Sequence, residues 1–176
     1  MGMAFDPLDT SEYPTVYVAH SFMFHKKDLK DCYNGKVSKV SGKQLDQMEN
    51  IITGLPVSDH DHGINGIIFG NDGELYIQVG GNTNAGVPGP MSSRSQLGEG
   101  YFSAATLVAY LNRPNFSGFI EYDGNGYPKP GLDIEVFASG QRNPYDLTLH
   151  TKYVSFVFPV AMHTWVVILT RSVFSL

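Results

Sequence analysis

Short apolar runs, each bounded by residues that favour turns, constrain the fold of this chain more than any other feature. The runs are rich in β-branched and aromatic residues, and nearly all end at Gly, Pro, Asn or Asp. The best helix candidate, residues 43–50, is short and has a weak apolar face. The sequence therefore predicts an all-β fold. The predicted strands are residues 15–19, 36–40, 50–53, 66–69, 75–79, 106–111, 119–122, 134–138 and 146–149.

The composition is that of a globular protein with a core. The chain has 176 residues, of which 42% are hydrophobic and 16% are charged. The formal net charge is −5, whereas binding to nucleic acid needs a basic patch that neutralises phosphates. We therefore expect no nucleic-acid partner.

A faint internal repeat organises the predicted strands. The strand pair within residues 3–18 resembles the pair within residues 67–77, and each pair is followed by further strands that end at a glycine, Gly54 or Gly140. Units of four antiparallel strands that repeat radially are typical of a β-propeller, whose loops on one face build the binding site. The repeat therefore predicts propeller blades.

The number of units predicts an incomplete ring. The first unit covers about residues 3–56, the second about residues 62–140 with an insertion at 80–100, and the third begins at Arg142. Propellers typically close with about four to eight blades, so two blades and the start of a third form only part of one. We expect residues 2–150 to be a propeller fragment that associates with other chains through exposed blade edges.

The last segment, residues 151–176, differs from the rest of the chain. It contains no Gly, Asn or Asp, and it gathers aromatic residues such as Phe156 and Trp165. Its apolar stretch at 166–169 is far shorter than the roughly 20 residues of a transmembrane helix, so we expect no membrane span. We interpret the segment as a divergent C-terminal tail; a buried strand pair is the alternative. The first residues lack the pattern of a signal peptide.

One histidine lies directly before a predicted hairpin. Asn71, Asp72 and Gly73 tolerate the positive φ of a tight turn between two β-forming runs, and His62 precedes the first run. Side chains at the rim of a sheet often line a pocket. Two alternatives remain: His60 and His62 could form a metal-binding pair, or His62 could be a structural loop residue.

The order of these elements resembles the glucose/sorbosone dehydrogenase family of six-bladed propellers. The resemblance covers about residues 2–150. It rests on His62 ahead of Phe69-Gly70, Asp72-Gly73 and Leu75-Tyr76, and on the later run Gly140-Gln141-Arg142-Asn143-Pro144. It implies a secreted parent protein that oxidises a sugar or alcohol with pyrroloquinoline quinone (PQQ) and calcium. Fungal pyranose dehydrogenases and hedgehog-interacting proteins are relatives in this family.

The resemblance also implies roles for three residues. His62 matches the general base that removes the hydroxyl proton of the sugar while hydride passes to PQQ, a role that suits a neutral imidazole. Arg142 matches the arginine beside the quinone oxygens, where a permanent positive charge stabilises developing negative charge. Asn143 would donate a hydrogen bond to the cofactor. Without the resemblance, residues 142–144 could equally be a strand entry.

Two departures from the family pattern concern activity. The family orients its catalytic histidine with an aspartate, and Gly81 stands at that position. Asn82 or Asn84 could orient the ring but would not stabilise an imidazolium as an aspartate does. The calcium ligands of the family, and most of its remaining cofactor contacts, lie in blades that this chain lacks. The alternatives are therefore a non-catalytic binding propeller, like the hedgehog-interacting proteins, and a truncated product without activity.

Two loops are further candidates for binding: residues 82–90 and residues 123–126. Residues 82–90 are too long and polar for a passive hairpin connection, so we expect them to contact the substrate. Residues 123–126 resemble the opening of a calcium loop but lack its downstream glutamate, which predicts an ordinary turn.

Overall fold

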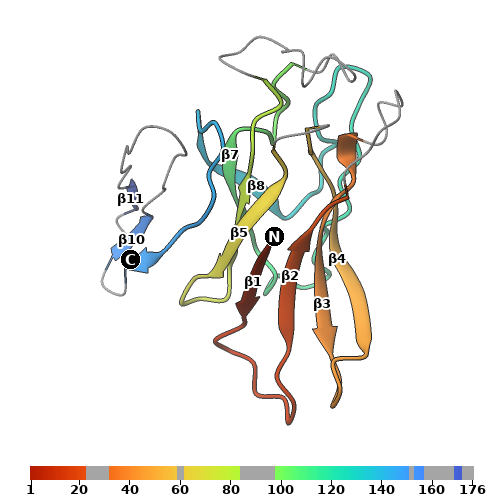
Figure 1. The fold of residues 1–176 in the computed structure, drawn as a ribbon, viewed down its shortest axis with the longest axis vertical. Helices are drawn as coiled ribbons and strands as arrows, with labels where there is room; N and C mark the ends of the chain where they lie inside the picture. Colours follow the sequence, from red (N-terminus) through yellow and green to blue (C-terminus); the bar gives the residue numbers. More distant parts are fainter. Residues whose placement is uncertain (23–31, 59–61, 84–97, 151–152, 157–168, 172–176) are drawn as a thin grey trace.

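A computed structural model describes residues 1–22, 32–58, 62–83, 98–150, 153–156 and 169–171. Within these residues the chain is all-β and contains no α-helix (Figure 1). Two four-stranded antiparallel sheets stack on each other and do not close into a ring. The predicted fold class is confirmed: an all-β, incomplete propeller-like architecture.

The first sheet is an antiparallel meander of β1 (Gly2–Phe5), β2 (Val16–His20), β3 (Gly35–Ser41) and β4 (Gln47–Leu55). Its register pairs Phe5 with Val16, and Val16 in turn with Val40. Directly opposed residues project to the same face, so this register separates the side chains of the sheet into two faces.

The second sheet repeats this order with β5 (Ile64–Phe69), β6 (Leu75–Val79), β7 (Ala105–Ala109) and β8 (Ile134–Ser139). The turn between β5 and β6 is the one predicted from sequence, and its Gly73 has a φ of +82°, a conformation that glycine adopts without strain. The two predicted repeat units therefore correspond to the two sheets.

The hydrophobic core lies between the two sheets. The inner face of the first sheet packs Tyr17 edge-to-face on Phe69 of the second, with ring centroids 4.9 Å apart. Buried aliphatic residues of both sheets fill the remaining space, and each contributes apolar area removed from water. They include Ala19, Val37, Ile52, Leu55, Ile64, Ile67, Leu75, Ile77, Val79 and Leu107.

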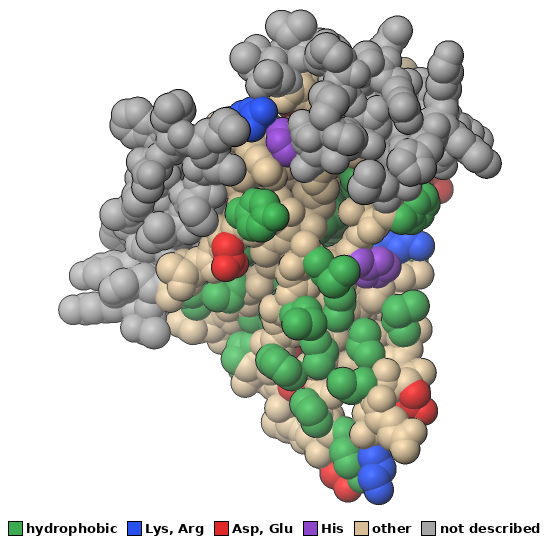
Figure 2. Space-filling view, viewed as in Figure 1, with side chains coloured by type: hydrophobic (Ala, Val, Ile, Leu, Met, Phe, Trp, Pro, Cys, Tyr) green, Lys and Arg blue, Asp and Glu red, His purple; other side chains and the backbone are tan. Residues whose placement is uncertain are grey.

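The opposite side of the first sheet is here called the outer face. The register places six apolar side chains on it: Met3, Phe5, Val16, Val18, Val40 and Met48. Its largest side chains are well exposed, at 70% for Met3, 63% for Phe5 and 69% for Met48. Figure 2 shows hydrophobic side chains gathered over this sheet. The outer face of the second sheet differs, because Leu147 packs there against Tyr76 and Val108.

Two predicted strands are wrong in extent. Residues 119–122 join no sheet; Phe119 forms a single parallel bridge with Thr53 of β4, and its side chain is 63% exposed. The run predicted at 146–149 is a strand only from Leu149, in β9 (Leu149–His150). One residue of each run, Ile120 and Leu147, packs its side chain against the residues of a sheet although its backbone joins none.

The tail contributes strands to a third, small sheet. β10 (Tyr153–Phe156) pairs with β9 on one side and with β11 (Leu169–Arg171) on the other. The predicted tail therefore contains the strand pair β10–β11. In the described part of the chain, no helix has the length and apolar character to cross a membrane.

Candidate functional site

His62 lies where the second sheet begins, two residues before β5. Its side chain is only 8% exposed. Ser58 fixes its backbone: the Ser58 hydroxyl oxygen accepts a hydrogen bond from the His62 N–H at 2.7 Å, and the Ser58 N–H donates to the His62 carbonyl at 2.8 Å. These hydrogen bonds to Ser58 fix the backbone of His62 independently of any contact of its ring.

The His62 ring is oriented by a backbone carbonyl. Nδ1 lies 2.8 Å from the carbonyl oxygen of Gly81. A carbonyl oxygen can only accept, so Nδ1 carries the proton in this hydrogen bond. In the neutral ring Nε2 is then the unprotonated nitrogen, which is the nitrogen that can accept a proton. We assign this tautomer from the bonding partner.

Gly81, which stands where the resemblance predicts an aspartate, bonds the His62 ring. The residue at the expected aspartate position does orient the histidine, but through its main chain. A carbonyl dipole fixes the tautomer as a carboxylate would, and it offers less charge to stabilise an imidazolium. Of the two asparagines predicted as possible orienting groups, Asn82 does not bond the ring, because its side-chain nitrogen donates to the Gly98 carbonyl at 3.3 Å. Asn84 lies outside the described residues.

Two consecutive glycines allow this close approach. A Cβ on Gly80 would lie 2.6 Å from the His62 Cβ, and one on Gly81 would lie 3.0 Å from a carboxylate oxygen of Glu99. The Gly80 backbone meanwhile continues the sheet, because its N–H donates to Gly63 and its carbonyl accepts from Ala104. The position of His62 thus depends on the absence of a side chain at residue 80.

The same glycine links His62 to Arg142. The Gly81 N–H donates to the Arg142 carbonyl at 2.7 Å, while the Gly81 carbonyl accepts from the His62 ring. β5 begins, and β6 and β8 end, at the same end of the second sheet, so residues distant in sequence meet there (Figure 1). The Arg142 side chain is exposed. The structure therefore brings these two predicted site residues to one end of the second sheet.

Asn143 lies beside β5. Its side-chain oxygen accepts a hydrogen bond from the Asn65 amide at 3.0 Å, and the same Asn65 nitrogen donates to the Pro144 carbonyl at 2.8 Å. These bonds orient the Asn143 amide and leave its nitrogen as a donor. All three predicted site residues thus belong to one end of one sheet.

The sequence reasoning missed Glu99. Its carboxylate accepts hydrogen bonds from the backbone N–H groups of Asn82 and Thr83, each at 2.9 Å, and from the hydroxyls of Thr83 and Ser103, the latter at 2.5 Å. It thereby joins the two ends of the insertion that separates β6 from β7. A signal was present, because Glu99 is the only acidic residue between Glu74 and Glu121.

Opposing effects act on the pKa of Glu99. Partial burial raises the pKa, but the hydrogen bonds from Ser103, Thr83 and Asn82 stabilise the charged form and together hold the pKa below the ordinary glutamate value. Glu99 and the three residues that bind its carboxylate, Asn82, Thr83 and Ser103, are here called the clamp. The clamp therefore carries a negative charge at neutral pH.

The remaining candidates have different outcomes. His60 and most of the 82–90 loop lie outside the described residues. Residues 123–126 form a turn, in which Asp123 Oδ1 accepts from the Asn125 and Tyr127 N–H groups at 2.8 and 2.9 Å. Across the ranges that the structure describes, no group of three or more His, Cys, Asp or Glu residues is placed to hold a metal ion.

Comparison of the chain with models of protein families found no match, and comparison with curated proteins found none either.

Proposed function

We propose that this chain is part of a quinoprotein-like sugar or alcohol dehydrogenase in which His62 is the general base. The observation that carries the proposal is the hydrogen bond from His62 Nδ1 to the Gly81 carbonyl. It fixes the ring and leaves Nε2 to remove a hydroxyl proton. The resemblance to the glucose/sorbosone dehydrogenase family supports the same role.

The donors at this end of the sheet fit an anionic quinone. The Arg142 guanidinium offers several N–H donors and a permanent charge, and the Asn143 side-chain nitrogen offers another donor. PQQ, when bound, would supply the hydride acceptor. The contribution of the chain is to orient that acceptor with Arg142 and Asn143 and to take the proton on His62. We assign no calcium ligand within the described residues.

A substitution that keeps the hydrogen bond and removes the base tests the proposal. Asparagine at position 62 retains an N–H donor for the Gly81 carbonyl but has no basic nitrogen. In the complete propeller, supplied with PQQ, calcium and an aldose, His62→Asn should lower dye-linked oxidation by about 10²-fold or more. The control is His20→Asn, because His20 bonds Ser38 at 2.7 Å on the first sheet. An unchanged rate in His62→Asn would remove His62 from the mechanism.

A non-catalytic binding propeller is the second candidate. The observation that favours it is the carbonyl at His62 Nδ1, where a strong base would have a carboxylate. In that case the complete protein oxidises no aldose and binds a secreted protein partner. Binding that survives His62→Asn, together with no turnover, would support this candidate over the enzyme.

A further inference from the structure

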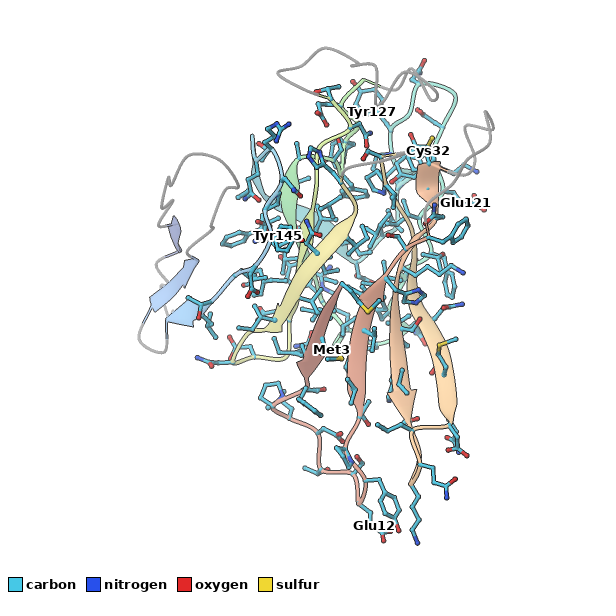
Figure 3. The ribbon with its side chains drawn as sticks, in the orientation of Figure 1. Met3, Glu12, Cys32, Glu121, Tyr127 and Tyr145 are labelled. Carbon is cyan, nitrogen blue, oxygen red and sulfur yellow. The ribbon has the colours of Figure 1, made fainter. Side chains whose placement is uncertain are left out.

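A cavity of about 410 Å³ opens beside Glu99, and neither candidate function uses it. Its side-chain walls are Tyr33, Tyr101, Tyr127, Glu99 and Asn125, and glycine backbone completes it. In Figure 3 Tyr127 lies at the end of the molecule opposite Glu12, among the loops. The volume lies within the range of small-molecule sites, about 300–1,000 Å³.

Three tyrosine rings line the cavity, and two of them are well exposed. Tyr101 and Tyr127 are 50% and 59% exposed, and their ring centroids lie 6.2 Å apart at an interplanar angle of 63°. Buried Phe102 supports Tyr101 from behind, with centroids 5.1 Å apart. The Tyr33 ring packs on the Tyr122 ring, with centroids 4.2 Å apart. The Tyr33 and Tyr101 rings therefore pack against other aromatic rings, while Tyr101 and Tyr127 keep much of their surface in contact with solvent.

The described residues give the cavity a negative charge. Among those that line it, Glu99 is the only ionisable group apart from the tyrosines, and none is a lysine or an arginine. Each carboxylate oxygen of Glu99 already accepts two hydrogen bonds from the clamp. A ligand with N–H donors would find these two oxygens occupied and would have to bond the tyrosine hydroxyls, the Asn125 amide oxygen or a glycine carbonyl instead. A cation without N–H groups has no donor hydrogen bonds to water that the cavity must replace.

We propose that this cavity binds a quaternary ammonium group. The electron-rich faces of Tyr101 and Tyr127 attract such a cation, and the Glu99 carboxylate adds Coulomb attraction without a direct hydrogen bond. A compact primary ammonium is more strongly hydrated, so more of its hydrogen bonds to water must be replaced when it enters the cavity. His62 does not line the cavity, so the proposal does not depend on the proposed oxidation.

Titration of the full 176-residue chain with choline tests the proposal. The matched control ligand is 3,3-dimethylbutan-1-ol, which has the shape of choline without the charge. We expect calorimetry or NMR to show tighter binding of choline than of the neutral analogue. Tyr127→Ala should weaken choline binding by about two- to fivefold, the range of an exposed cation–π contact, and Tyr127→Phe should retain it.

Tyr145→Ala is the control variant, because Tyr145 is 63% exposed and lies apart from Tyr127 in Figure 3. Equal binding of choline and its neutral analogue would overturn the proposal. So would no detectable binding of choline, equal weakening by Tyr127→Ala and Tyr145→Ala, or binding of glucose in place of choline.

Discussion

Replacing Gly80 with alanine should displace His62, because the structure leaves no room for the new methyl group. The added Cβ would lie 2.6 Å from the His62 Cβ and 3.3 Å from its Cα. Ordinary contact between carbon atoms needs about 3.5–4.0 Å. The backbone segments around residues 62 and 80 must therefore separate by roughly 1 Å. Overpacking of this kind costs about 1–3 kcal/mol of unfolding free energy. The hydrogen bond between the His62 ring and Gly81 should lengthen at the same time.

Urea denaturation measures the first effect, and the ring signals of His62 in NMR spectra report the second. Gly124→Ala is the control, because a Cβ there meets nothing within 4 Å. In the complete propeller, a shift of about 1 Å at the base should also lower activity by about 10²-fold. If Gly80→Ala is as stable as Gly124→Ala and leaves the His62 signals in place, the packing account of this site is wrong.

Two further predictions concern the clamp and the outer face. The pKa of Glu99 is lowered in the folded state, so the stability it contributes is complete above the unfolded glutamate pKa of about 4.3 and is lost as pH falls through the lower folded value. Glu99→Gln should therefore be less stable than the parent chain at neutral pH, and this difference should shrink in acid; a constant difference in urea titrations would contradict the clamp. The exposed outer face should make the chain self-associate. Phe5→Lys with Met48→Lys should shift it toward monomer in analytical ultracentrifugation, whereas a parent chain that is already monomeric refutes the prediction.

The strands could be predicted because their signals are local. Gly73 and its neighbours mark the turn between β5 and β6, and the repeat predicted two units that the structure shows as two sheets. The run at 119–122 misled the prediction, since an apolar run of strand length does not reveal whether it joins a ladder or lies beside one.

The site could be predicted only in part. The resemblance directed attention to His62, Arg142 and Asn143, which the structure brings to one end of the second sheet. The orienting group could not be predicted, because every residue has a carbonyl and only the path of the chain decides which one meets Nδ1. Glu99 was missed for a similar reason: it binds residues 82 and 83 across a long insertion, and no local pattern links them.

The protonation of the His62 ring tests the central claim most directly. In alkaline buffer, ¹⁵N NMR of the histidine rings distinguishes a protonated from an unprotonated ring nitrogen. The hydrogen bond to Gly81 predicts that Nδ1 of His62 carries the proton and that Nε2 is unprotonated. A ring protonated at Nε2 would mean that the Gly81 carbonyl does not orient His62, and this site would then have no prepared base.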